Sequence, residues 1–148
     1  MTALNIEQNM EFVMGLDEEQ KVVFMKVLAR LANADGCFDK NEQEFIKEIS
    51  QLYGISANKI EEIMNVKDDD EVVEAASLIK NRKVALELIK EMCILAHSDD
   101  VLSERETDFI GRVGEAMGVE LEKIEQISRW VIDRIIWQEE AKLIFELD

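Results

Sequence analysis

Four acidic residues are the main candidates for a functional site in this sequence: Asp35, Glu42, Asp99 and Glu106. Asp35 precedes Glu42 by seven residues, and Asp99 precedes Glu106 by the same seven. Helical spacing from the apolar residues nearby directs all four side chains towards the buried side of a helix. Because burying a carboxylate without a partner is costly, each must find hydrogen-bond donors, a cation or a proton.

Two interpretations of these carboxylates stay open. Glu42 and Glu106 each end a capping-box pattern, in which a glutamate reaches back to the first amide of its helix. Capping does not explain Asp35 and Asp99, which close the preceding helices, where the helix dipole disfavours a negative charge. Hard oxygen ligands at such a corner suit Ca²⁺, Mg²⁺ or Mn²⁺. We therefore predict a divalent-cation site at these four residues, with capping and turn satisfaction as the alternative.

Other chemistries have weaker support. Counting Gly36 as the sixth position of an EF-hand loop puts Leu31 at the first, so the coordinating pattern fails. His97 is expected to be a charged helix-end residue rather than a ligand. Since the sequence shows neither a nucleophile with a nearby base nor a phosphate loop, we predict no enzymatic activity. Thiol chemistry is a third hypothesis, although Cys37 and Cys93 are both expected in the core.

The acidic corners belong to an internal repeat. Residues 21–63 align without a gap to residues 85–127 at an offset of 64, with 12 identities in 43 pairs. Two copies are too few for an open solenoid, so we expect the halves to face each other around one core. The prediction is a single domain over 1–148.

Composition favours helices. The 148 residues include no proline and six glycines, and Glu, Lys, Leu, Ile, Ala and Met abound. We predict an all-α bundle of about seven to eight helices, built from two pseudo-twofold-related repeats. The net charge of −16 argues against nucleic acid as a partner. It favours cations, basic protein patches or simple solubility.

Capping and turn signals set the expected helix boundaries. The expected helices cover 5–14, 18–35, 40–53, 57–64, 69–79, 82–98, 104–117 and 120–146. The acidic run 65–70 between the repeats is expected to be a solvated loop. Trp130 and Trp137 share one face of the last helix, which we expect in the core or in a homodimer seam, with a ligand site as the alternative. The apolar tail after them could dock on this domain or on a partner.

The chain shows no signal peptide and no apolar run long enough to span a membrane. Two cysteines at non-equivalent places in the repeats fit a reducing compartment better than a structural disulfide. These features predict a cytoplasmic protein.

One motif resembles a known family. Ala34-Asp35-Gly36, followed by Glu42 on a helical hairpin, resembles the TerB-like tellurite-resistance domain, and the resemblance covers about residues 20–130. It implies an all-helical domain with an acidic, metal-binding centre. It also implies a cytoplasmic role in tellurite or broader chemical-stress response, through protein complexes at the inner face of the membrane. In the second copy Asp100 replaces the turn glycine, so that corner is more acidic. The competing hypothesis is a protein-interaction scaffold whose carboxylates only cap helices.

Overall fold

The computed structural model describes residues 11–32, 39–97 and 102–147. Within these ranges the secondary structure is helical throughout, which confirms the predicted fold class. The helices are α2 (Glu18–Ala32), α3 (Lys40–Leu52), α4 (Ala57–Met64), α5 (Asp69–Ala76), α6 (Arg82–His97), α7 (Glu104–Ala116) and α8 (Leu121–Ile144). Of the predicted opening helix 5–14, residues 11–14 are helical and the rest lies outside the described residues.

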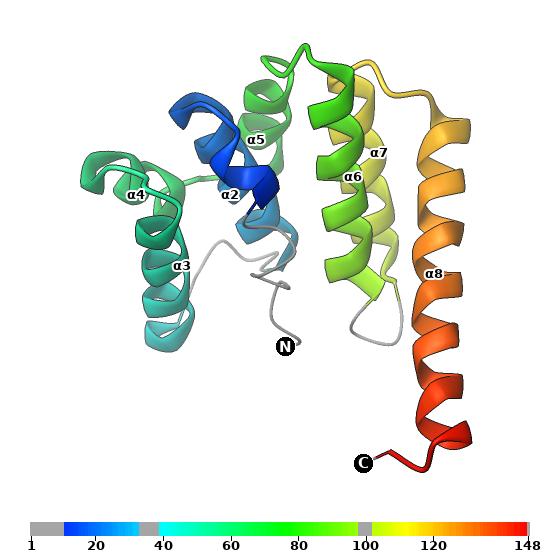
Figure 1. Cartoon of the computed structure of the whole chain (residues 1–148). Coiled ribbons are helices and arrows are strands. Elements are labelled where there is room, and N and C mark those ends of the chain that lie inside the picture. The colour runs from blue at the N-terminus through cyan, green and yellow to red at the C-terminus, as the bar shows by residue number, and fades with distance from the viewer. Residues whose placement is uncertain (1–10, 33–38, 98–101, 148) are drawn as a thin grey trace.

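The internal repeat reappears as a repeat of helices. Shifting the bounds of α3 by 64 residues gives those of α7, and the same shift places α2 on α6 and α4 on the first two turns of α8. In Figure 1, α2 lies between the α3–α4 pair and α6, while α8 lies on the far side of α6. The linking helix α5 packs against both α2 and α7. The two repeats therefore share one body.

Buried apolar residues from both repeats form one cluster. The predicted core faces of the two long helices are buried in it: Phe24, Leu28 and Leu31 on α2, and Leu88, Met92 and Leu95 on α6. Cys93 is buried beside them, as expected, whereas Cys37 lies outside the described residues. The halves thus face each other around a common core, as the alignment predicts.

Local signals in the sequence set most helix ends. Gly54 and Gly118 adopt positive φ angles of 78° and 79°, and the amides after them bond to carbonyls five residues back, at Ser50 and Gly114. These are Schellman-type C-caps, for which glycine is the residue without a steric cost. Each turn redirects the chain into the next helix of its repeat.

One boundary prediction was wrong, and one expected capping bond is absent. The helix predicted over 69–79 ends at Ala76. After it, the amides of Ser77, Leu78 and Ile79 donate to carbonyls three residues back, which is the pattern of a tighter turn. Ser56 precedes α4 but makes no capping bond with its side chain, and its hydroxyl instead hydrogen-bonds with Asn58. These deviations leave the order of elements unchanged.

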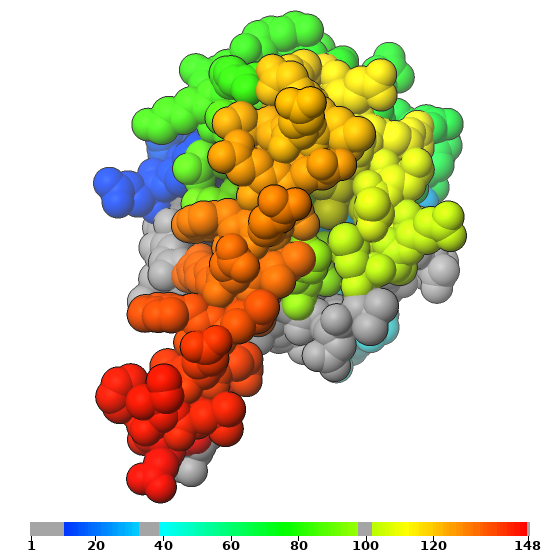
Figure 2. All heavy atoms as spheres, turned by 90° about the vertical axis from the view of Figure 1, so that its right-hand side faces the viewer, coloured from blue at the N-terminus to red at the C-terminus, as the bar shows by residue number. Residues whose placement is uncertain are grey.

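The expectation that Trp130 and Trp137 belong to the core was also wrong. Their exposed fractions are 55% and 70%, and the buried face of α8 is formed by Ile124 and Val131. The C-terminal half of α8 extends past α6 and α7 (Figures 1 and 2). The apolar tail does not dock on this domain, since Leu143, Ile144 and Phe145 are exposed. None of the helices that the structure describes is both long and apolar enough to cross a bilayer.

Candidate functional site

Two of the four predicted ligands lie in the described residues. Glu42 and Glu106 occupy the third position of α3 and α7, and both are half-buried. Asp35 and Asp99 lie outside the described residues, as do the turn positions Gly36 and Asp100. The starts of α3 and α7 lie at the same end of the molecule as the ends of α2 and α6 (Figure 1). The first turns of α3 and α7, which carry Glu42 and Glu106, therefore lie at one end of the bundle.

Glu42 closes a capping box with Asp39. The amide of Glu42 donates to the Asp39 carboxylate at 2.8 Å, and the Asp39 amide donates to Glu42 Oε1 at 3.1 Å. Sequence predicts this arrangement because both partners are three residues apart at a helix start. Glu42 therefore caps α3, as the alternative interpretation predicts.

Glu106 makes the same arrangement in the second repeat. Its amide donates to the Ser103 hydroxyl at 3.1 Å, and the Ser103 amide donates to Glu106 Oε1 at 3.1 Å. Each bond uses one oxygen of a carboxylate that has two, with about four lone-pair positions. The capping bonds are therefore compatible with a cation held by the same side chains, and the donor set suits a hard ion.

The two corners are joined by Arg105, which the sequence analysis did not single out. From the first turn of α7, Arg105 Nη2 donates to the carbonyl of Arg30 at 2.9 Å and Nη1 to that of Leu31 at 3.4 Å. These carbonyls belong to the last turn of α2, whose dipole favours a positive charge. Arg105 thus gives the first corner a cation from the second repeat.

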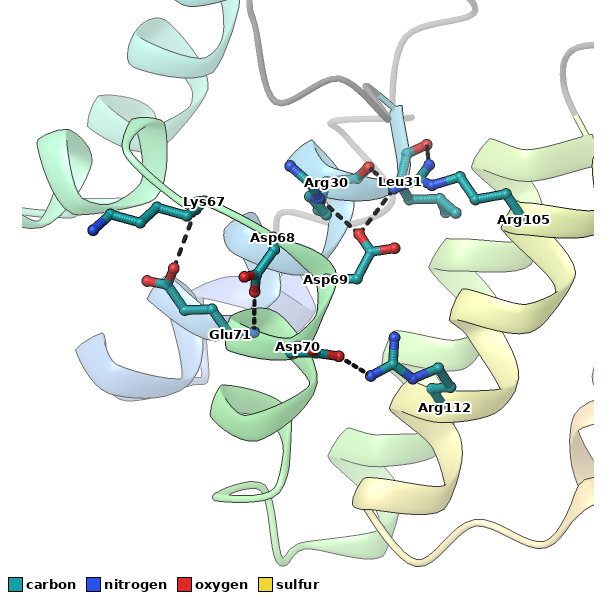
Figure 3. Close-up of polar contacts among 9 residues, drawn as sticks. All are labelled: Arg30, Leu31, Lys67, Asp68, Asp69, Asp70, Glu71, Arg105 and Arg112. Atoms are coloured by element: carbon teal, nitrogen blue, oxygen red, sulfur yellow. Dashed lines mark hydrogen bonds and ion pairs between the residues drawn. The ribbon is translucent and has the colours of Figure 1, made fainter.

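Asp69 completes this contact between the repeats (Figure 3). Its carboxylate lies 2.7 Å from Arg30 Nε and 3.0 Å from Arg105 Nη2, and its side chain is 25% exposed. Burial alone would raise the pKa of the Asp69 carboxyl, but hydrogen bonds and charge from the two arginines outweigh it and lower the pKa below its usual value. We call Arg30, Asp69 and Arg105 the inter-repeat clamp.

Asp69 and Asp70, the last residues of the acidic run 65–70, belong to α5, which confirms the predicted helix start at residue 69 and shortens the predicted loop. Asp68 accepts the amide of Glu71 at 2.9 Å and caps α5, whose first residue is Asp69. Asp70 is paired with Arg112 of α7, although its side chain stays 80% exposed. The acidic run starts a helix and meets arginines, because a helix start favours negative charge.

A signal for the clamp exists in the repeat alignment. Arg30 aligns with Ile94 and Arg105 with Asn41, so the chain changes an apolar or neutral residue to arginine at two otherwise equivalent positions. An arginine that is present in one copy and absent from the other is a candidate for a contact that breaks the pseudo-twofold symmetry. Pairing the two arginines with Asp69 requires the tertiary structure.

His97, the last residue of α6, points to α8. Its Nε2 lies 2.9 Å from the hydroxyl of Ser128. Burial lowers the pKa of the imidazole, and the negative charge of Glu106 offsets this only in part. The lowered pKa disfavours the charged ring, contrary to the expectation of a charged helix-end histidine. The carboxylate of Glu106 is close enough for its charge to act on the imidazole.

Cys93 is an inert thiol. It is 1% exposed, and burial raises its pKa to about 12. Since the thiolate is the reactive form, this residue does not support thiol chemistry in the native state.

An apolar cavity of about 240 Å³ lies beside the first corner. Among the described residues, its floor is formed by Met25, Leu28 and Phe45. Asp39 and Glu42 contribute its polar part. Within the described ranges no three His, Cys, Asp or Glu side chains gather closely enough to hold a metal ion. A cation site at these corners therefore depends on Asp35 and Asp99.

Comparison with known families gives a match to both repeats. The family model described as "Tellurite resistance protein TerB" matches residues 4–65 and again residues 64–129. The two matches meet at the start of the linker before α5, and their ends, 65 and 129, are 64 residues apart, as in the alignment of the repeats. No curated protein and no solved structure matches the chain.

Proposed function

Because this chain belongs to the family of the tellurite resistance protein TerB, we propose that it is a non-enzymatic, acidic helical module that binds a divalent cation. In this proposal Asp35, Glu42, Asp99 and Glu106 supply the ligands, and the ion is Ca²⁺, Mg²⁺ or Mn²⁺. The module acts in the cytoplasmic response to tellurite or wider chemical stress, as part of protein complexes that include partners at the inner membrane face.

One observation supports the proposal: the first turns of α3 and α7, which carry Glu42 and Glu106, lie at one end of the bundle, and Arg105 links the start of α7 to the end of α2. The guanidinium that reaches the carbonyls of Arg30 and Leu31 comes from the residue directly before Glu106. The start of α7 is thereby held against the last turn of α2, which ends three residues before Asp35. Arg105 also places a positive charge near the proposed site, so the carboxylates must attract the ion strongly enough to offset the repulsion by this guanidinium.

The alternative is a protein-interaction scaffold in which the carboxylates only cap helices. The capping boxes of Glu42 and Glu106 support it as far as these two residues are concerned. Capping is worth about 1 kcal/mol per helix and has no dependence on a divalent ion. A cation-dependent gain in stability therefore separates the two functions.

The test is thermal unfolding with and without each cation, followed by circular dichroism. A ligand at a hundredfold excess over its Kd stabilises the native state by about 2.7 kcal/mol, which raises Tm by roughly 5–10 °C in a chain of this size. We expect such a rise for one of the three ions, and we expect Asp35→Asn with Asp99→Asn to abolish it.

The matched control is Glu74→Gln with Glu115→Gln, which removes the same two charges from exposed positions on α5 and α7. This control should keep the full rise in Tm. If both double variants keep it, the ion binds elsewhere or through general screening of the charge of −16. If none of the three cations raises the Tm of the unmodified chain, the scaffold function is supported.

A further inference from the structure

The end of α8 after Ile135 is largely exposed in the part of the chain that the structure describes. Ile135 is its last apolar residue packed on the core, and all residues from Ile136 to Leu147 are exposed except Ala141, which is half-buried. The nine helical residues 136–144 are fewer than the roughly 12–15 that an isolated helix needs in water. A partner that covers this segment would therefore also stabilise its helical form.

This segment carries a stripe of alternating apolar and acidic side chains. Steps of three and four residues along α8 lead through Trp130, Asp133, Trp137, Glu140 and Ile144, so these five lie along one face. We call these five residues the α8 stripe. All five are exposed. Figure 2 shows the projecting end of the helix open to solvent.

The α8 stripe is acidic. Neither Asp133 nor Glu140 has an ion-pair partner within residues 11–32, 39–97 and 102–147. A surface groove of about 250 Å³ along α8 joins Asp133 and Trp130 to two further carboxylates, Glu122 and Glu125, with Arg129 as its basic residue. Negative charge and indole rings therefore alternate along the stripe, and both attract cationic side chains.

The exposed aromatic area is large for a monomer. A fully exposed aromatic residue presents roughly 150–250 Å², so Trp130, Trp137 and Phe145, at 55%, 70% and 69% exposure, leave about 300–500 Å² open. Patches of this size mark interaction sites. An opposing helix would bury a similar area, which corresponds to a small interface of the transient kind.

We propose that the α8 stripe binds a basic amphipathic helix of another protein, with apolar residues over Trp130, Trp137 and Ile144 and with Lys or Arg against Asp133 and Glu140. This deepens the proposed role in protein complexes and is independent of the cation site.

The same charges disfavour a second copy as the occupant. Two chains of net charge −16 repel each other. An antiparallel pair centred on Trp137 brings Asp133 of one copy near Glu140 of the other, and like charges across an interface oppose binding. Acidic lipid surfaces are disfavoured for the same reason.

The test uses a synthetic helical peptide of about 20 residues, or roughly six turns, with leucine on one face and lysine on the flanks. Trp130 and Trp137 are the two tryptophans of the chain, so intrinsic fluorescence reports binding at the stripe directly. We expect binding at micromolar concentration that weakens as salt is added, and none to a peptide with glutamate in place of lysine. EDTA in all samples keeps the result independent of cation binding.

Matched variants locate the site. Asp133→Asn with Glu140→Gln should weaken binding about tenfold or more, which corresponds to about 1.4 kcal/mol. Glu44→Gln with Glu48→Gln removes two exposed charges from α3, on the side of the bundle away from α8, and should leave binding unchanged. All four residues are exposed, so the variants should fold normally, which circular dichroism checks.

Three outcomes would overturn the proposal. If peptide binding weakens equally in the two double variants, the peptide responds to the net charge of the chain and does not recognise the α8 stripe. A dimer in sedimentation velocity that Trp137→Ser abolishes identifies a second copy as the occupant. A fluorescence change with lipid vesicles and none with the basic peptide identifies a membrane surface.

Discussion

Asp69 and Arg105, which are 36 residues apart in the sequence, meet at 3.0 Å and join the linking helix α5 to the first turn of α7. The same guanidinium holds the last turn of α2, so one side chain connects three helices. The Arg105 guanidinium also lies over the ring of Phe109, 5.5 Å from the ring centroid. This cation–π contact further fixes the arginine side chain. The contact between the repeats is therefore polar as well as apolar.

Replacing Asp69 should destabilise the fold more than replacing its neighbour. Asp69→Asn leaves two arginines at the clamp without their shared negative charge, and we expect a loss of about 2 kcal/mol in the free energy of unfolding. Asp70→Asn, beside it, breaks a pair whose carboxylate is 80% exposed and should cost about 0.5 kcal/mol or less. Urea unfolding of both variants measures the difference. Equal losses would contradict the structural role of the clamp.

Acid should act through the same carboxylate. A lowered pKa in the folded state means that Asp69 contributes stability above its unfolded pKa of about 4, and that this contribution is lost as the pH falls through the folded value. Glu62, whose pKa is lowered chiefly by its hydrogen bond from Lys26, adds a smaller contribution with the same sign. The free energy of unfolding should therefore fall below about pH 4. In Asp69→Asn this fall should be shallower, as urea titrations across that range would reveal.

Two glycines of α7 should respond oppositely to alanine. A Cβ at Gly114 meets the side chain of Ile124 on α8, whereas nothing lies within 4 Å of a Cβ at Gly111. Gly111→Ala should stabilise the helix by about 0.5–1 kcal/mol. Gly114→Ala should lose about 1 kcal/mol, since overpacking outweighs the gain in helix propensity. Thermal unfolding of the pair tests the close approach of α7 and α8, and a gain at both sites would exclude it.

The thiol of Cys93 should react only when the protein unfolds. With its pKa raised to about 12 and 1% exposure, it presents almost no thiolate at neutral pH. In a Cys37→Ser background, alkylation should be slow in buffer and fast in denaturant. Rapid native-state labelling would reopen thiol chemistry with tellurium compounds.

The sequence predicts those parts of the fold that depend on near neighbours. The capping boxes at Asp39 and Ser103 and the turns at Gly54 and Gly118 rest on contacts within five residues, so the chain shows them directly. The repeat alignment adds a correspondence between α3 and α7 that local patterns could not give. These signals account for the order and most bounds of the helices.

The remaining features depend on distant residues. Arg105 reaches carbonyls 74 and 75 positions away, and spacing along one helix does not reveal such a partner. The face of α8 that packs was also misjudged, because apolar residues occur on several sides of this helix. Val131 and Ile124 are buried while Trp130 is exposed, and only the position of α6 decides between them.

His97 offers a test of the corner itself, because it is the one histidine of the chain and gives an isolated proton NMR signal. Burial lowers its pKa, so the ring should titrate below the usual value of about 6.5. Because the unfolded chain takes up this proton first, stability should fall as the pH drops below about 6.5 and level off once the folded ring is protonated. Glu106 acts in the opposite direction, so Glu106→Gln, which keeps the capping box, should lower the midpoint further. A divalent ion bound at Glu106 neutralises the same charge and should produce the same shift, which Glu106→Gln then removes. A His97 midpoint that is unaffected by Ca²⁺, Mg²⁺ and Mn²⁺ would argue that Glu106 caps α7 and holds no ion.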